Sequence, residues 1–269
     1  MFKGAKFAGL TAVTALLMSA TAHAGAIYEP EASLKDPEPE ARRCSLSANV
    51  ALGTEYVFRG ITQTDEGATI QGGFDVECGM FYAGVWASNL DFAGSTNGNG
   101  DIVDTADIEI DTYAGIKATI PNTPVEVDLG VIYYAYPQGE DPTAELDFVE
   151  FKLGASATLL PNLSTGVTVF YSPDYTLEVG ENWVFEATAE YTLPQVGIFS
   201  PSISGTYGYQ EGDEADGGVD YQYYNAGLTL GFMEKFALDV RYWDTDGDAL
   251  ANCKDVCDER IVGTLSASF

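Results

Sequence analysis

Histidine is almost absent from this sequence of 269 residues, which has only His23. It falls within residues 1–24, which look like a removable export signal: two lysines, a short apolar run and an Ala-His-Ala cleavage site ending at Ala24. A retained N-terminal anchor is less favoured, because the run is too short to span a bilayer. The mature chain should then have no histidine, which excludes Ser-His-Asp and Cys-His catalysis and zinc sites with histidine ligands.

Basic residues are also scarce: 12 Lys and Arg stand against 41 Asp and Glu, a formal net charge of −29. A chain of this charge is unsuited to nucleic acid, whose phosphates require lysine and arginine. Disorder is excluded for most of the chain by its 46% apolar and 12% aromatic residues. Residues 25–43 are the exception, because they combine prolines with acids, and we expect a flexible periplasmic lead there.

No later stretch is apolar enough for a transmembrane helix. What the chain has instead is period-two alternation. In residues 236–244, for example, Phe236, Leu238 and Val240 alternate with polar or charged neighbours. We predict twelve strands, at residues 45–59, 69–77, 81–92, 108–118, 125–136, 146–158, 164–175, 182–193, 200–210, 221–232, 236–244 and 260–269.

The segments between these strands alternate in length. Short turns follow the even-numbered strands, whereas longer segments, much richer in acids, follow the odd-numbered ones. This pattern is typical of an outer-membrane barrel. We therefore predict an all-β fold, a transmembrane antiparallel up-and-down β-barrel over residues 44–269 with both ends periplasmic. A soluble β-sandwich also alternates but usually has shorter strands, and is the less favoured alternative.

Aromatic residues cluster near both ends of the predicted strands, as in interfacial girdles. The turn-end girdle is predicted to contain Phe81, Tyr82, Phe199, Phe232, Phe236 and Phe269. The loop-end girdle is predicted to contain Tyr56, Phe58, Tyr133, Tyr171, Tyr175, Trp183, Tyr221, Tyr223, Tyr224 and Tyr242.

The polar face of the strands would line the lumen. Its acidic candidates are Glu55, Asp75, Glu77, Glu109, Asp111, Glu126, Asp128, Glu150, Glu186, Glu190 and Asp239. Its basic candidates are Arg59, Lys117, Lys152 and Arg241. Because rings of carboxylates favour cations, this lumen predicts cation preference. A twelve-stranded barrel is intermediate between small barrels filled by their own side chains and large barrels with an aqueous channel. A narrow pore and an occluded lumen are therefore both kept as alternatives.

Four cysteines in an exported chain suggest disulfides. Cys44 precedes the first predicted strand and Cys78 follows the second, so a hairpin between them brings both to the periplasmic end. We predict a Cys44–Cys78 bond, with Cys253 and Cys257 pairing locally. Free thiols are the alternative.

Asp244, Asp246 and Asp248 have the 1, 3, 5 spacing of a calcium loop, but Ala249 stands where that loop needs glycine. We expect a solvated acidic loop, with a weak surface site for Ca²⁺ or Mg²⁺ as the lesser alternative. No other cofactor is expected.

Several stretches carry a family resemblance. They are Glu55-Tyr-Val-Phe-Arg-Gly-Ile61, Tyr82-Ala-Gly-Val-Trp-Ala-Ser-Asn89, Glu109-Ile-Asp-Thr-Tyr-Ala-Gly115, Tyr133-Tyr-Ala-Tyr-Pro137 and Tyr171-Ser-Pro-Asp-Tyr175. From about Ser45 to Phe269 the chain resembles the TorF-type porins, the Gcw_chp family of bacterial outer-membrane proteins. The resemblance implies a Gram-negative outer-membrane barrel and a channel role. It transfers no substrate and no catalytic residue.

These observations predict a non-enzymatic porin for passive diffusion of small hydrophilic solutes or cations, surrounded by outer-membrane lipid. One alternative is a non-conducting structural or adhesive barrel whose acidic loops face outward. Less favoured is a barrel enzyme acting on lipid or glycan through carboxylates. Homo-oligomerisation is left open.

Overall fold

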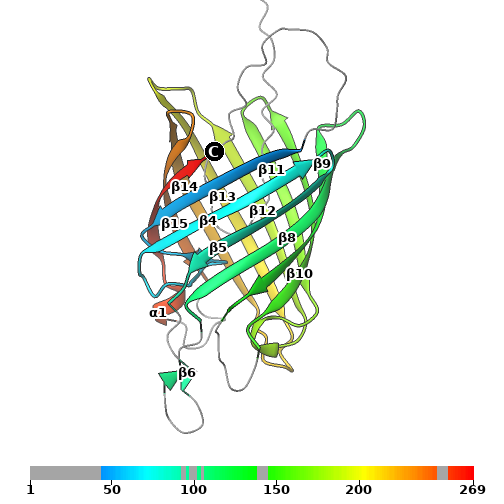
Figure 1. The fold of residues 1–269 in the computed structure, drawn as a ribbon, viewed down its shortest axis with the longest axis vertical. Helices are drawn as coiled ribbons and strands as arrows, with labels where there is room; N and C mark the ends of the chain where they lie inside the picture. Colours follow the sequence, from blue (N-terminus) through cyan, green and yellow to red (C-terminus); the bar gives the residue numbers. More distant parts are fainter. Residues whose placement is uncertain (1–43, 92–94, 97–101, 104–105, 138–144, 247–253) are drawn as a thin grey trace, which may run out of the picture.

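Twelve antiparallel strands close into one barrel in the computed structural model, which describes residues 44–91, 95–96, 102–103, 106–137, 145–246 and 254–269 (Figure 1). Each strand pairs with its neighbours along the chain, and β1 pairs with β16 to complete the wall. The predicted all-β, up-and-down barrel is therefore confirmed. The proposed export signal and the lead at 25–43 lie outside the described residues.

The barrel strands are distributed along the chain from Ser45 to Ser268. Their bounds are β1 Ser45–Gly53, β4 Thr69–Cys78, β5 Phe81–Asn89, β8 Ile108–Thr119, β9 Val125–Ala135, β10 Phe148–Leu160, β11 Leu163–Ser172, β12 Asn182–Thr192, β13 Phe199–Gly212, β14 Tyr221–Phe232, β15 Phe236–Thr245 and β16 Arg260–Ser268. The small elements are β2 Val57–Phe58, β3 Ile61–Thr62, β6 Ser95–Thr96, β7 Ile102–Val103, η1 Thr176–Glu178 and α1 Lys254–Cys257. No helix in the described ranges is long and apolar enough to cross a membrane.

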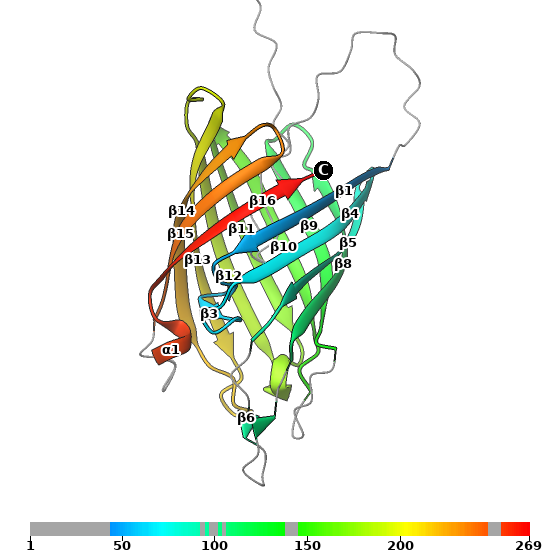
Figure 2. The same cartoon turned by 60° about the vertical axis from the view of Figure 1, so that its left-hand side comes forward.

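The first strand is shorter than predicted. It ends at Gly53 rather than at residue 59, and the chain that follows leaves the wall and forms the separate hairpin β2–β3. Figure 2 shows β3 beside the end of β1 and the start of β4, at the end of the barrel that carries α1. The prediction failed because the hairpin is itself extended and continues the alternation of polar and apolar residues.

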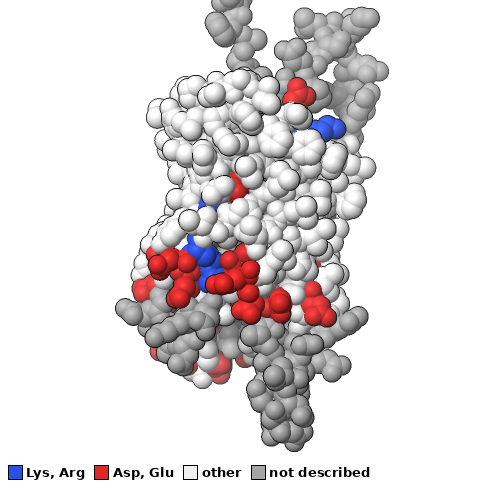
Figure 3. Space-filling view, turned by 90° about the vertical axis from the view of Figure 1, so that its left-hand side faces the viewer, with Lys and Arg blue, Asp and Glu red and all other residues white. Residues whose placement is uncertain are grey.

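The outer face of the barrel is apolar. Side chains such as Phe74, Leu153 and Ile261 are half or more exposed, although they belong to regular strands. Figure 3 shows a broad uncharged surface, with acidic side chains gathered at the end that carries α1. An apolar band of this kind is what a bilayer requires of a barrel.

The aromatic girdles were predicted only in part. Tyr133, Trp183, Tyr224 and Tyr242 near the loop end, and Phe81, Phe199, Phe236 and Phe269 near the turn end, are exposed on the outside. The assignment of Tyr56, Phe58, Tyr82, Tyr221 and Tyr223 to the girdles was wrong, because all five are buried. The barrel uses these rings to fill its interior.

A disulfide joins Cys44 to Cys78, as predicted, at the end where the short turns lie. The bond adjoins the last paired residues of β1 and β4, Ser45 and Glu77. Cys257 is also disulfide-bonded, while Cys253 lies outside the described residues.

Replacing Cys44 and Cys78 together by serine is expected to lower the free energy of unfolding by about 3–4 kcal/mol, because the bond closes a loop of intermediate length. Denaturant titration of the refolded protein in lipid vesicles measures this loss. The matched control replaces Cys253 and Cys257, whose predicted bond closes a much shorter loop and should contribute less. Equal losses from the two double variants would contradict the expectation.

Candidate functional site

The hairpin β2–β3 is the feature that distinguishes the interior. Val57 pairs with Thr62 and Phe58 with Ile61, so Arg59 and Gly60 form a two-residue turn. Both turn residues have positive φ, 49° for Arg59 and 82° for Gly60. Paired positive φ values are those of a type I′ turn, the common two-residue connection in hairpins.

Gly60 is required at this tip by close packing as well as by its φ. A Cβ at this position would lie 2.9 Å from the Cβ of Tyr223 on β14. The Thr245 hydroxyl on β15 donates a hydrogen bond of 2.9 Å to the Gly60 carbonyl. The tip therefore contacts β15 and β14, which lie two and three strands from β1 around the barrel.

The Arg59 side chain continues from this tip to β10. Its guanidinium donates two hydrogen bonds to the Glu150 carboxylate, of 2.8 and 2.9 Å, and both residues are almost fully buried. The same guanidinium lies over the rings of Phe58 and Phe170. Burial lowers the pKa of Arg59, but the charge of Glu150 and its hydrogen bonds, together with Tyr175 and Tyr134, outweigh burial, so the pKa is raised and the guanidinium stays charged.

Aromatic rings surround this ion pair. Tyr134 donates a hydrogen bond of 3.0 Å to Glu150, and its ring stacks on Phe148 at 4.3 Å. Tyr175, in the segment after β11, packs against Phe148. Burial raises the pKa of Tyr175 to about 12, so its hydroxyl stays protonated at neutral pH. At the level of Glu150 the interior is thus occupied by packed side chains.

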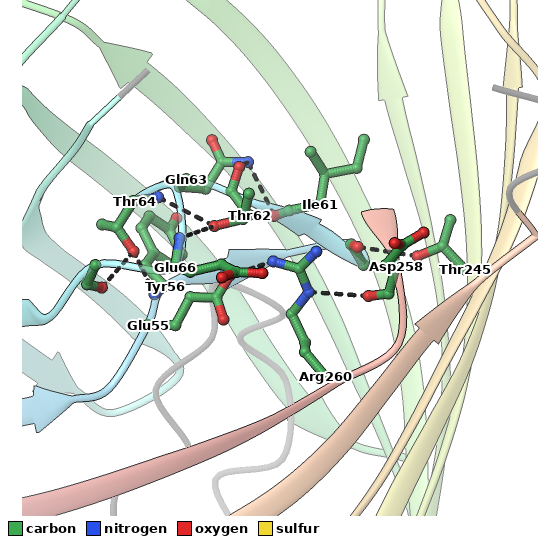
Figure 4. Close-up of polar contacts among 12 residues, drawn as sticks. Glu55, Tyr56, Ile61, Thr62, Gln63, Thr64, Glu66, Thr245, Asp258 and Arg260 are labelled. Atoms are coloured by element: carbon green, nitrogen blue, oxygen red, sulfur yellow. Dashed lines mark hydrogen bonds and ion pairs between the residues drawn. The ribbon is translucent and has the colours of Figure 1, made fainter. Parts of the chain in front are cut away.

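The base of the hairpin is held by a second ion pair. Glu55 accepts a hydrogen bond from Arg260 of β16, and Arg260 also donates to the Asp258 carbonyl (Figure 4). The backbone N–H of Tyr56 donates to the Thr64 hydroxyl at 3.0 Å, and that of Gln63 donates to the Tyr56 carbonyl at 2.7 Å. The hairpin is therefore fixed at both base and tip.

Further polar groups on the wall are satisfied within the lumen. Lys152 lies 2.9 Å from Asp128, which also accepts from the Tyr82 hydroxyl at 2.7 Å. Arg241 contacts Asp239 at 3.0 Å and also donates to Asn225 and Ser204. Two other carboxylates accept hydrogen bonds from tyrosines: Glu186 from Tyr223, and Asp75 from Tyr113.

The predicted lumen residues separate by depth. Buried are Glu55, Arg59, Glu109, Asp111, Asp128, Glu150, Lys152, Glu186 and Asp239; part-buried are Asp75, Lys117, Glu126, Glu190 and Arg241; exposed is Glu77. Most of the less buried ones lie in the strand halves next to the short turns. Those around the hairpin have almost no contact with solvent. The interior is therefore more accessible from the turn end and filled near the loop end.

One pair of acids has no basic partner. Glu109 and Asp111 share the inner face of β8, each is 1% exposed, and none of the ion pairs formed by described residues includes them.

Sequence analysis missed Arg260 as a member of the charged interior, since it was placed at the start of the last strand without a role.

The weak metal motif is only partly described. Asp244 accepts hydrogen bonds from Tyr224 and Tyr242, so tyrosine hydroxyls occupy its carboxylate. Asp248 lies outside the described residues. Within the described ranges, no cluster of three or more His, Cys, Asp or Glu is arranged to hold a metal ion.

A family model described as "Bacterial protein of unknown function (Gcw_chp)" matches residues 38–269. The chain belongs to the Gcw_chp family. The hairpin tip in this Gcw_chp protein is formed by Phe58-Arg59-Gly60, which belongs to the Glu55–Ile61 stretch that carries part of the resemblance. No curated protein sequence matches the chain.

Three solved structures that are similar to this chain are outer-membrane porins or channels. The KdgM porin, solved in complex with disordered oligogalacturonate, has a TM-score of 0.55 at 8% identity, covering 83% of this chain and 98% of that one. The NanC porin has a TM-score of 0.48 at 10% identity, with coverage of 84% and 99%. The COG4313 outer-membrane channel from Pseudomonas putida F1 also has 0.48 at 10% identity, with 87% and 99%. At these identities the likeness to KdgM shows a common porin fold.

Proposed function

We propose that this Gcw_chp protein is a porin-like channel of the Gram-negative outer membrane, in which small hydrophilic solutes diffuse passively and cations are preferred. The proposal agrees with the role implied by the resemblance to TorF-type porins. It involves no bond chemistry. The observation that carries it is a closed, outwardly apolar barrel whose charged interior is crossed by the hairpin β2–β3.

The hairpin is the constriction in this proposal. It leaves the wall after Gly53 and reaches Glu150 on β10 and Thr245 on β15, so a solute must pass it. On the short-turn side of the hairpin, the lumen carries partly accessible acids such as Asp75, Glu126 and Glu190. Acids in excess of bases along this route would attract cations and repel anions.

The test is single-channel conductance of refolded mature protein in a planar bilayer under a salt gradient. Discrete steps with a cation-selective reversal potential are expected, because most lumen bases are already paired with acids. Anion selectivity would overturn the cation preference. Folding is checked independently by heat-shifted gel mobility.

The second candidate is a non-conducting structural or adhesive barrel, and the filled loop half of the lumen favours it. Arg59, Tyr134 and Glu150 are each no more than 2% exposed, as in a protein core. A correctly folded protein that stays silent in the bilayer would support this candidate. Removing the acidic loop 213–220 should then abolish surface adhesion, whereas a channel would keep its permeation.

A further inference from the structure

Glu109 and Asp111 form a pair of neighbouring acids on the inner face of β8. Their carboxyl groups face each other closely, and both are almost completely buried. One Glu109 oxygen accepts a long hydrogen bond of 3.4 Å from Tyr136, and Tyr56 of the hairpin segment also faces Glu109. The other Glu109 oxygen and both Asp111 oxygens receive no hydrogen bond from described residues.

No basic residue in the described part of the chain forms an ion pair with Glu109 or Asp111. Strand pairing places Trp86 on one side of Asp111 and Tyr134 on the other. Arg59, at the tip of the hairpin, is already bound through both terminal nitrogens to Glu150. Two buried carboxylates without a compensating charge are costly, so such groups normally acquire a cation or a proton.

The number of carboxylate oxygens without a hydrogen bond distinguishes a shared proton from a bound cation. One shared proton would form a single bond between the two carboxyls and would leave one of the three orphaned oxygens without a partner. A cation placed between Glu109 and Asp111 can contact all three. The donors are all oxygens, which hard cations prefer, and a divalent ion neutralises both carboxylates at once.

We propose that Glu109 and Asp111 form a binding site for one hard divalent cation in the lumen wall, beside the hairpin. With only two carboxylates available, its affinity for Ca²⁺ belongs in the weak range of about 10⁻⁴–10⁻³ M found in extracellular modules. The bound ion strengthens the contact between β8 and Tyr56, which belongs to the hairpin segment. A further consequence, which rests on the proposed function, is that bound divalent cations favour the closed constriction.

Binding is tested on the refolded mature protein in detergent, stripped of metal and titrated with CaCl₂ by calorimetry from about 10⁻⁵ to 10⁻² M, which brackets the expected range. One saturable site is expected. Glu109→Gln and Asp111→Asn, which keep the side-chain shape and remove a charge, should each weaken binding at least about tenfold, as expected when one of two charged ligands is lost. Glu214→Gln, an exposed acid of the 213–220 loop, is the matched control and should bind as the unaltered protein does.

Other outcomes overturn the inference. Unchanged calcium binding in both site variants would do so, as would binding that is lost in Asp244→Asn instead. Absence of saturable binding to the unaltered protein would indicate the shared proton. If a site variant fails to fold, the heat-induced unfolding midpoint of the unaltered protein decides: it should rise with Ca²⁺ and fall back with chelator, and a constant midpoint counts against the site.

The measurement is independent of ion flow. A protein that conducts but binds no calcium keeps the proposed channel and loses the cation site. A protein that binds calcium through Glu109 and Asp111 but is silent in the bilayer keeps the site and loses the channel.

Discussion

Excising residues 57–62 is expected to raise single-channel conductance several-fold. The cut removes the hairpin strands and its tip, leaving Tyr56 directly before Gln63. These two residues are already joined by a backbone hydrogen bond of 2.7 Å, so the new connection spans no gap. The barrel strands and the Glu55–Arg260 pair are untouched. Water can then reach Glu150 and Tyr223, which the hairpin covers in the intact protein.

The structure offers a matched control at the same end of the barrel. In the loop between β13 and β14, the N–H of Gly218 donates to the carbonyl of Asp213 at 2.7 Å, so residues 214–217 can be excised by the same design. Among the described residues, no hydrogen bond or ion pair joins this loop to Arg59 or Glu150. Conductance should be unchanged there. Equal conductance of the hairpin deletion and the intact protein would show that the hairpin is not the constriction.

The wall of this barrel could be predicted from the sequence because it depends on local periodicity. Residues such as Ile108, Ile110 and Thr112 point outward and Glu109 and Asp111 inward, as strict alternation requires. The Cys44–Cys78 bond followed from the same reasoning, since an antiparallel hairpin brings its two ends together. Strand pairing between sequence neighbours, common to all up-and-down barrels, then determined the topology.

The interior could not be predicted in the same way, because its contacts join distant parts of the chain. Arg59 and Glu150 are separated by 91 residues, and Glu55 and Arg260 by 205. One local signal for the hairpin was present: Arg59-Gly60 lies between Val57-Phe58 and Ile61-Thr62, two pairs of residue types common in strands, as in a hairpin with a two-residue turn.

The girdle error has a related cause. Tyr223 and Tyr224 are neighbours near the loop end, but alternation turns one inward and the other outward. Counting aromatics by their position along the strands ignored which face each ring occupies. Except for Tyr82, which lies against Asp128 on the short-turn side, the inward rings belong to the hairpin segment or to β14 beside its tip, so the error concealed the filled interior.

Replacing Arg59 by methionine is expected to destabilise the closed hairpin by about 3–5 kcal/mol, the usual cost of leaving one member of a buried ion pair alone. Glu150 would then be buried with only the Tyr134 hydroxyl as a partner. The barrel wall does not depend on this pair, because its strands are held by backbone hydrogen bonds. The lost stability should therefore appear as release of the hairpin, with a higher open probability in single-channel recordings, rather than as unfolding of the barrel.

The double variant Arg59→Met with Glu150→Gln separates charge from packing. It removes the isolated carboxylate while keeping side chains of similar size, and a matched neutral pair often restores what a single deletion costs. The open probability should return most of the way to that of the intact protein. Lys235→Met, which removes one positive charge from an exposed turn, controls for the change in net charge. If both the single and the double variant open equally, the Arg59 side chain holds the hairpin by packing against Phe58 and Phe170, and its charge contributes little.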